Sequence, residues 1–561
     1  MKSLNICLIL FPVIGTICFE CKQETSRELE KSIDSIFVEY DNRERPGAAV
    51  SVVKDGEVLF SKGYGSANLE YDIPVTSSTI FHIASVSKQF TVFSILLLVA
   101  DGKIGFDDDV RKYIPEVPDF GKTITLRHLA SHTSGLRDQW GLLAMAGWRL
   151  DDVITQDHIL KLVSKQQDLN FAPGEEFAYC NTGFTLLAEV VARVSGESFA
   201  EFTKKRIFEP LGMTNTLFYD DHEKIVKNRA YSYYSFQGDY KKSVLSYANV
   251  GATSLFTTVE DLCQWALNFE TPNVGNETII KEMGSLATLN NGKTFGGAYG
   301  QFIEDYKGLN QIQHAGGDAG YRSYFARFPD QNFSISVLSN LDAANPRKLA
   351  LNVADYVLKN DFPTISQKQE DSDTYIPSKE ELKDIIGYYW TEKFSVINQV
   401  FSEDGELRFS VGNGSKPLKP IGENTFQLQD VGDAKVIVSL DKGEVYKAIH
   451  VTINDGVPRI GLAYQPVSYT STTLKEFAGT FHSKELSTTY NFSAQDTSLI
   501  VTHAKNQSFN VVPLMEDTFI RGSWYFRNIN FVRDESNSII GIKVSSDRVK
   551  NLYFDKIDNY N

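Results

Sequence analysis

Two residues that can work as a nucleophile and its base, Ser85 and Lys88, stand three positions apart. They occur in FHIASVSKQF at 81–90, directly before the apolar segment TVFSILLLVADGKIGF. Residues three apart share one face of a helix, so the two side chains would meet. Burial lowers the pKa of a lysine ammonium, and a neutral lysine can take the proton of a serine hydroxyl. The spacing therefore predicts a nucleophilic serine, unless Ser85 is only the polar start of a buried helix.

The same Ser-x-x-Lys spacing also occurs at Ser51–Lys54 and Ser439–Lys442, in segments expected to be a strand and a hairpin. Only the copy at 85–88 opens a long apolar helix, where an unpaired lysine would be costly. The apolar context, rather than the motif itself, therefore distinguishes Ser85.

A second polar pair, Tyr179 and Asn181, occurs in FAPGEEFAYCNTGF at 171–184. On an extended loop, side chains two positions apart point the same way. The tyrosine hydroxyl can then relay a proton between nucleophile and leaving group, and the asparagine amide can fix the lysine or donate to a substrate carbonyl. Tyr-x-Asn also occurs at 40–42 and 247–249, and the alternative is a packed tyrosine beside a turn-forming asparagine.

A third candidate is His314, which precedes Gly316 and Gly317 in QHAGGDAGYRS at 313–323. Glycines at a strand edge let a substrate backbone approach closely. The histidine can bind a substrate carboxylate or assist proton transfer, or it is an ordinary half-buried histidine in a turn. Asp318 borders this segment and could tune His314.

In this order, Ser-x-x-Lys, Tyr-x-Asn and His-x-Gly at 85, 179 and 314 resemble the motifs of the serine β-lactamase and penicillin-binding protein superfamily. The supporting runs are GAAVSVVKDGEVLFSKGYGSANLE, TITLRHLASHTSGL, FAPGEEFAYCNTGF and EPLGM. The chain is most similar to the class C and DD-peptidase branch, with its esterases and D-aminopeptidases, over about residues 30–355. The third motif of the superfamily is Lys-Thr-Gly. Here it is HAG; histidine occurs there in many peptidase and esterase relatives, which argues against efficient β-lactam hydrolysis.

The resemblance implies an acyl-enzyme mechanism, in which Ser85 attacks a carbonyl while Lys88 and Tyr179 share the base role. Backbone N–H groups of Ser85 and Gly317 would form the oxyanion hole. The resemblance implies no metal and no organic cofactor.

The resemblance also implies binding roles around the nucleophile. Asn181 would orient the substrate amide, and His314 would engage the substrate carboxylate or Tyr179. Gly316 would line the strand edge beside the substrate. His132, in SHTSGL, is expected to be a structural hydrogen-bonding residue.

These motifs need a framework of strands and helices. Residues 46–66 predict two strands about a KDGE turn, and residues 321–340 predict two more about a PDQ turn. A buried helix is expected at about 86–101, and helical apolar spacing continues through 184–194. With the resemblance, residues 25–360 predict an α+β domain of the β-lactamase/DD-peptidase type, an antiparallel sheet flanked by helices plus an all-helical lobe.

The composition changes at about residue 361, where a polar stretch without periodicity predicts a linker over 361–376. Beyond it, an internal repeat predicts two similar all-β units, 377–467 and 470–558, as small antiparallel barrels or sandwiches. These units resemble the lipocalin-like domains appended to some peptidases of the superfamily. The matching stretches are LKDIIGYYW (382–390) with LKEFAGTFH (474–482), and PIGENTF (420–426) with PLMEDTF (513–519).

Length and charge narrow the class of protein. A chain of 561 residues needs more than one core, and a net charge of −15 disfavours nucleic acid, because phosphate binding needs a basic surface. Residues 1–21, with Lys2 before an apolar run, have the layout of a secretory signal peptide or of an uncleaved anchor. Cys18 or Cys21 could carry a lipid, so export to the periplasm or attachment to the cell envelope is expected.

The sequence thus predicts an exported serine hydrolase acting on D-amino-acid peptides, of the DD-carboxypeptidase or D-aminopeptidase type. An esterase or β-lactamase on the same scaffold needs the same acyl chemistry and is the alternative. A non-catalytic penicillin-binding sensor is less favoured, because all three motifs are intact. The expected partners are a small peptide, ester or β-lactam substrate and further copies of the chain, bound through the C-terminal units.

Overall fold

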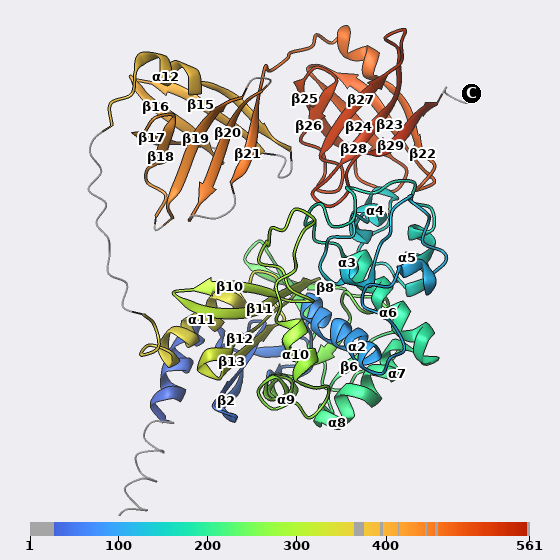
Figure 1. The fold of residues 1–561 in the computed structure, drawn as a ribbon, viewed down its shortest axis with the longest axis vertical. Helices are drawn as coiled ribbons and strands as arrows, with labels where there is room; N and C mark the ends of the chain where they lie inside the picture. The colour runs from blue at the N-terminus through green and yellow to red at the C-terminus, as the bar shows by residue number, and fades with distance from the viewer. Residues whose placement is uncertain are drawn as a thin grey trace, which may run out of the picture. The chain divides into compact units, whose positions relative to one another are not determined.

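The computed structural model describes residues 27–557 except for six short stretches or single positions (Figure 1). The described ranges are 27–363, 375–392, 396–412, 414–432, 434–443, 446–454 and 458–557. The predicted signal peptide, with Cys18 and Cys21, lies outside them, as do residues 364–374 of the predicted linker. Contacts divide the chain into a first unit, residues 1–139 with 150–364, and a second unit, residues 140–149 with 365–561.

A six-stranded antiparallel sheet with the order β10-β11-β12-β13-β1-β2 forms the centre of the first unit. Both predicted hairpins are present: β1 and β2 join through Asp55 and Gly56, which have positive φ angles of 51° and 76°. The strands are β1 (Ala48–Lys54), β2 (Glu57–Tyr64), β10 (Phe302–Tyr306), β11 (Leu309–Asp318), β12 (Tyr321–Phe328) and β13 (Phe333–Ser339).

Helices cover both faces of this sheet. Along β1, Val50 and Val52 belong to an apolar cluster with residues of α11 (Pro346–Val357). The intervening Ser51 donates a hydrogen bond from Oγ to the carbonyl of Val259, the first residue of α9 (Val259–Glu270). Because alternate residues of a strand face opposite sides, α11 and α9 lie on opposite faces, and β1 is buried between them.

The predicted buried helix is α2 (Lys88–Ala100), in which every residue from Lys88 to Leu98 is buried. It begins after a short 3₁₀ turn, η2 (Ala84–Ser87), so Ser85 lies on the turn rather than on the helix. This turn packs against β11 and β12, and α2 packs against α6 (Asn181–Ser195). Ser85 and Lys88 therefore lie between the sheet and the helical part of the unit.

The predicted helical lobe surrounds α6, which packs against α2, α3, α5 and α7. The remaining helical elements are η1 (Val38–Tyr40), η3 (Val110–Lys112), α3 (Leu126–Ala130), α5 (Gln156–Val163), α7 (Phe199–Thr203), η4 (Lys204–Phe208), α8 (Glu209–Leu211), α10 (Glu277–Met283) and η5 (Pro329–Gln331). The short strands are β3 (Ser66–Asn68), β4 (Ile73–Pro74), β5 (Phe81–His82), β6 (Leu217–Phe218), β7 (Ser232–Phe236), β8 (Asp239–Ser243) and β9 (Leu255–Thr257).

The second unit contains two closed antiparallel barrels, β14–β21 and β22–β29, which confirm the expectation of two small all-β structures. The first barrel comprises β14 (Gly387–Thr391), β15 (Val396–Glu403), β16 (Glu406–Val411), β17 (Gly414–Gly422), β18 (Thr425–Leu428), β19 (Val436–Lys442), β20 (Lys447–Ile453) and β21 (Arg459–Tyr464). The second comprises β22 (Gly479–Ser483), β23 (Thr488–Gln495), β24 (Ser498–His503), β25 (Phe509–Met515), β26 (Thr518–Ile520), β27 (Asn528–Arg533), β28 (Ile539–Ser545) and β29 (Leu552–Ile557).

The repeated sequences occupy the same places in both barrels. The first pair of matching stretches leads from a short helical element, α12 (Lys379–Ile385) or η7 (Thr473–Phe477), into the first strand of each barrel. The second pair forms the hairpins β17–β18 and β25–β26, and each hairpin carries a register shift beside its proline. The repeat in the sequence therefore corresponds to a repeat in the structure.

Residues 140–149, which include most of α4 (Gln139–Met145), group with the second barrel. The buried Tyr490 donates from Oη to the carbonyl of Met145 at 2.8 Å, and Asn506 donates from Nδ2 to the carbonyl of Ala144 at 2.9 Å. A Cβ added to Gly141 would lie 2.9 Å from a methyl group of Val549. This segment of the chain is therefore held by a barrel whose own sequence starts more than three hundred residues later.

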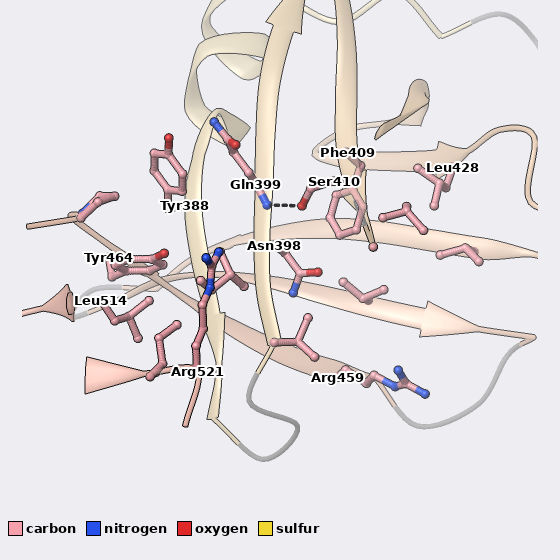
Figure 2. A pocket seen from close by; sticks show the side chains of 18 of the residues that line it. Tyr388, Asn398, Gln399, Phe409, Ser410, Leu428, Arg459, Tyr464, Leu514 and Arg521 are labelled. Atoms are coloured by element: carbon pink, nitrogen blue, oxygen red, sulfur yellow. Dashed lines mark hydrogen bonds between the residues drawn. The ribbon is translucent and has the colours of Figure 1, made fainter. Parts of the chain in front are cut away.

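The two barrels share an apolar contact, in which Trp390 of the first packs with Leu514 and Ile520 of the second. A cavity of about 740 Å³ adjoins this contact (Figure 2). Phe409 and Leu428 of the first barrel line it together with Leu514 of the second. Within the described parts of the chain, no helix has both the length and the apolar character that crossing a bilayer requires.

Candidate active site

The predicted nucleophile and base are in contact. Lys88 Nζ lies 3.0 Å from Ser85 Oγ, 2.9 Å from Asn181 Oδ1 and 2.7 Å from the carbonyl oxygen of Ala252. In the neutral form that base catalysis requires, a lysine amine has two N–H groups and one lone pair. Since the oxygens of Asn181 and Ala252 can only accept, they take the two N–H groups. The lone pair then faces Ser85 Oγ, which is the geometry that a base for this hydroxyl needs.

The lysine is fully buried, at 0 % exposure, in a partly aromatic setting. Its Nζ lies 4.9 Å from the ring centre of Tyr179 and 5.4 Å from that of Phe184. Burial without hydrogen bonds would be costly for this group, and the two rings and the hydrogen bonds to Asn181 and Ala252 offset that cost. The helix start and the apolar residues that follow it therefore hold Lys88 in a single position.

His314 of the His-x-Gly motif lies next to Tyr179 of the Tyr-x-Asn motif. Tyr179 Oη lies 3.5 Å from His314 Nε2, while His314 Nδ1 lies 2.6 Å from the carbonyl oxygen of Ala315. Because a carbonyl only accepts, Nδ1 carries the proton, and Nε2 presents its lone pair to the tyrosine hydroxyl. Burial, with a contribution from the charge of Lys88, lowers the pKa of His314 to about 3. A neutral imidazole offers no charge to a substrate carboxylate, so the geometry favours the predicted contact with Tyr179 over the carboxylate role.

The amide of Asn181 is oriented by its two neighbours. Its Oδ1 accepts from Lys88, and its Nδ2 donates to Asp138 Oδ2 at 2.8 Å. The backbone N–H of Asn181 donates to the same oxygen at 2.7 Å. The asparagine was expected on an extended loop, but it is the first residue of α6. Asp138 was not predicted from the sequence, because no spacing along the chain relates it to the motifs.

His132 packs against Tyr179, the predicted catalytic tyrosine. Its ring stacks on Tyr179 with centres 4.2 Å apart and planes inclined by 26°. Its Nδ1 accepts the backbone N–H of Cys180 at 2.9 Å. Both contacts act on the segment that carries Tyr179 and Asn181, which fits the expected structural role of this histidine.

The glycines of the third motif let β11 lie directly against η2. A Cβ on Gly316 would fall 2.3 Å from the carbonyl oxygen of Ile83 and 3.0 Å from the backbone nitrogen of Ser85. No side chain fits at such distances from backbone atoms. The strand therefore passes close to Ser85, and its N–H at Gly317, together with that of Ser85, remains the predicted oxyanion hole.

Asp318 lies at the end of the same strand, but its contacts differ from the expectation that it tunes His314. Its carboxylate accepts a hydrogen bond from Thr253 Oγ1, and Oδ2 lies 4.0 Å from His82 Nδ1. Thr253 follows Ala252, whose carbonyl holds Lys88. The segment 252–253 is thus a part of the site that the sequence motifs did not indicate.

Comparison with known proteins identifies the family. A family model described as Beta-lactamase matches residues 33–358, more than half of the chain. The chain belongs to the beta-lactamase family. With Ser85, Lys88 and Tyr179 brought together as this chemistry requires, this member of the beta-lactamase family is a serine hydrolase.

Two relatives show how far the likeness extends. The chain is 27% identical to "Penicillin-binding protein 4*" of Bacillus subtilis (strain 168) over 448 residues, which cover 76% of this chain and 97% of the relative. It is 27% identical to a D-aminopeptidase of Brucella anthropi over 391 residues, which cover 68% of this chain and 70% of the relative. Both matches run past the end of the first unit.

Solved structures share the fold. The octameric penicillin-binding protein homologue from Pyrococcus abyssi has a TM-score of 0.53 and 25% identity, covering 78% of this chain and 99% of that one. The D-amino acid amidase from Ochrobactrum anthropi has a TM-score of 0.51 at 20% identity, covering 60% of this chain and 99% of that one. These structures confirm the predicted β-lactamase/DD-peptidase-like architecture of this family member.

Proposed function

We propose that this enzyme hydrolyses peptides or amides of D-amino acids through an acyl-enzyme on Ser85. The observation that carries the proposal is the position of Lys88 Nζ, 3.0 Å from Ser85 Oγ and held by Asn181 and Ala252. The D-aminopeptidase and penicillin-binding protein relatives support the class of substrate.

Acylation follows from the contacts around the nucleophile. Ser85 Oγ attacks the substrate carbonyl while its proton passes to the lone pair of Lys88 Nζ. The negative charge that develops on the carbonyl oxygen is stabilised by the N–H groups of Ser85 and Gly317. The Tyr179 hydroxyl protonates the leaving nitrogen as the carbon–nitrogen bond breaks. Tyr179 then regains a proton from Lys88, which restores the neutral amine.

Deacylation uses the same groups in reverse. A water molecule attacks the ester carbon and gives one proton to the base, the bond to Ser85 Oγ breaks, and the serine oxygen regains a proton. His314, neutral with its Nε2 toward Tyr179, accepts a hydrogen bond from the tyrosine and orients its hydroxyl. No step requires a positive charge on His314.

The neutral histidine bears on the choice among the predicted types. A DD-carboxypeptidase and a β-lactamase both act on substrates with a carboxylate near the reacting carbonyl, and a cation would attract that group. His314 supplies none, since its pKa is lowered to about 3. We therefore favour a D-aminopeptidase or amidase over a DD-carboxypeptidase, and keep an esterase on the same scaffold as the second candidate, because esters need the same acyl chemistry.

The first experiment measures hydrolysis of D-alanine p-nitroanilide and the intact mass after incubation with benzylpenicillin. We expect turnover by the wild type, and a complete loss of turnover in Ser85→Ala. Ser439→Ala, in β19 of the first barrel, is the matched control, because Ser439 and Lys442 repeat the motif without its surroundings. An equal loss in this control, or full activity of Ser85→Ala, would refute the assignment.

Export and assembly remain proposals. The apolar start of the chain supports a periplasmic or envelope location, with lipid attachment at Cys18 or Cys21. The mass of the mature N-terminus tests it. The octameric homologue from Pyrococcus abyssi supports a homo-oligomer through the barrels, which sedimentation of the full chain would test.

A further inference from the structure

One carboxylate beside the nucleophile has no part in the proton transfers described above. Asp318 is the last residue of β11, and the strand alternation places it on the same face as His314 and Gly316. Gly316 lies against the backbone of Ser85, and Gly317 is a predicted oxyanion donor. Asp318 therefore stands one residue beyond the place where the reacting carbonyl oxygen would bind.

One oxygen of this carboxylate is held and the other is available. Oδ2 accepts from Thr253 Oγ1. Oδ1 receives no hydrogen bond from the described part of the chain. The Asp318 side chain keeps 16% exposure, so a molecule in the site can reach it. A carboxylate with one fixed oxygen and one open oxygen is positioned to accept from a donor on the substrate.

Burial raises the pKa of Asp318, and the charges of Lys88 and Arg322 partly oppose that shift. Among the described residues, however, neither side chain forms a hydrogen bond with this carboxylate. Lys88 Nζ donates to Asn181 and Ala252 and lies 3.0 Å from Ser85 Oγ. Arg322 Nη1 donates to the carbonyls of Ala319 at 3.1 Å and Tyr321 at 2.7 Å.

The other titratable groups near Asp318 carry no positive charge at neutral pH. Burial lowers the pKa of His82 to about 3. Burial raises the pKa of Tyr247 well above its usual value, and the charges of Asp318 and Asp151 raise it further. Within the described residues, Asp318 has no lysine or arginine as a direct hydrogen-bonded partner.

We propose that Asp318 determines specificity by binding the α-ammonium group of the substrate. This inference rests on the proposed function and narrows it to D-amino-acid amides and peptides with a free N-terminus. The α-nitrogen of such a substrate is two bonds from the carbonyl carbon that Ser85 attacks. With the carbonyl oxygen at Ser85 and Gly317, that nitrogen can turn toward the next residue of the strand, which is Asp318.

The environment favours a cation over a neutral or anionic group. Burial raises the pKa of Asp318 to about 6, so the carboxylate is mostly ionised at neutral pH but poorly solvated. An ammonium group relieves that loss of solvation by forming a charge-assisted hydrogen bond. An N-acylated substrate leaves the Asp318 carboxylate without a cationic partner. A carboxylate on the substrate is repelled by Asp318. The same residue therefore also disfavours N-acylated and acidic substrates.

The test compares two anilides that differ in the ammonium group, together with an ester that has none. D-Alanine p-nitroanilide, N-acetyl-D-alanine p-nitroanilide and p-nitrophenyl acetate are assayed with the wild type and with Asp318→Asn, which keeps the size and one acceptor oxygen. In Asp318→Asn, we expect kcat/KM for D-alanine p-nitroanilide to fall by about 30-fold or more, mainly because KM rises. A loss of this size is typical when one partner of a buried charge pair is removed. The other two substrates should change by less than about threefold.

Asp305→Asn is the matched control, because Asp305 is also a carboxylate of the β10–β11 hairpin but accepts a hydrogen bond from the N–H of Gly308 at the turn. Its kinetics should equal those of the wild type. A second readout is the pH profile. For the free amine, kcat/KM should rise from about pH 5 to about pH 7 as Asp318 ionises, and this step should be absent in Asp318→Asn.

The outcomes separate this inference from the proposed function. If the wild type hydrolyses the free amine but Asp318→Asn loses activity equally on all three substrates, the specificity role is wrong. The same conclusion follows if the N-acetyl substrate is preferred. If the wild type hydrolyses neither D-alanine substrate, the proposed function itself fails, and the inference fails with it.

Discussion

At the residue scale, the donors and acceptors of the site allow only one arrangement of hydrogen bonds around Asn181. Asn181 stands between Lys88, which donates, and Asp138, which accepts, so its amide cannot be reversed. This fixes Oδ1 on the lysine and turns the lysine lone pair to Ser85. The position of the predicted base thus depends on a carboxylate, Asp138, which acts on it through Asn181.

Removing the Asp138 carboxylate should disturb the position of Lys88, the predicted base, while the lysine itself is retained. Asp138→Ala leaves Asn181 free to rotate and strips its backbone N–H of a partner, a loss of about 1–3 kcal/mol for a buried group. We expect kcat to fall by about 5- to 150-fold, which is that range converted at room temperature. Asp138→Asn keeps one acceptor oxygen and should recover part of the rate, measured on the same p-nitroanilide. Equal rates for the Ala variant and the wild type would contradict this role.

At the element scale, the catalytic geometry comes from the close approach of β11 to the η2 turn. The sheet places the strand, the buried α2 places the turn, and a missing side chain lets them meet. The two neighbouring glycines differ in this respect. A Cβ on Gly316 would meet backbone and Ser323 Oγ at 2.3 Å, whereas one on Gly317 would meet only the far end of Arg322 at 3.4 Å.

This difference predicts unequal effects for the same substitution. Gly316→Ala should push β11 away from Ser85, open the predicted oxyanion hole and lower kcat by about 100-fold or more, the cost of losing an oxyanion donor. Gly317→Ala should stay within about tenfold of the wild type, because its Cβ has room and its N–H is unchanged. Steady-state kinetics of the two variants, with circular dichroism to confirm folding, make the comparison. Equal activities would show that the approach of the strand is not limiting.

At the scale of the whole molecule, the chain is not divided in sequence order. Residues 140–149 interrupt the first unit and group with the second barrel, through Tyr490 and Asn506. This segment begins two residues after Asp138, which orients the active-site amide. The second barrel thus holds residues 140–149, which follow closely after Asp138 along the chain.

Loosening this hold should expose the segment to proteases. Tyr490→Phe removes the hydrogen bond to Met145 and leaves that carbonyl unpaired, at a cost of about 1–3 kcal/mol. We expect trypsin to cut after Arg149 several-fold faster in Tyr490→Phe than in the wild type, because proteolysis follows the population of locally opened states. Tyr446→Phe, at a tyrosine that is 68% exposed, is the control and should change nothing. An unchanged cleavage rate in Tyr490→Phe would contradict the proposed hold.

Much of the fold followed from local patterns. The apolar run after Lys88 predicted a helix buried on all sides, and α2 is one, because no polar face interrupts it. Alternation and turn residues predicted both hairpins of the sheet. The start of α6 at Asn181 was not predicted from the sequence. Gly183 lies in the first turn of this helix, and glycine disfavours a helix. A Cβ at Gly183 would lie 3.2 Å from the carbonyl oxygen of Leu129, so the close packing against α3 favours a glycine there.

By itself, the sequence determined the family motifs, the buried lysine helix and the repeated barrels, because each depends on residues close together along the chain. Only the tertiary structure decided which groups share a site. Asp138 meets Asn181 across 43 residues, Tyr179 meets His314 across 135, and Lys88 meets Ala252 across 164. No local spacing encodes such meetings, since they depend on how the sheet and the helices pack. Burial and hydrogen-bond direction are fixed only in the folded chain, where these partners are in contact. These two properties in turn determine the charge of His314 and of Asp318.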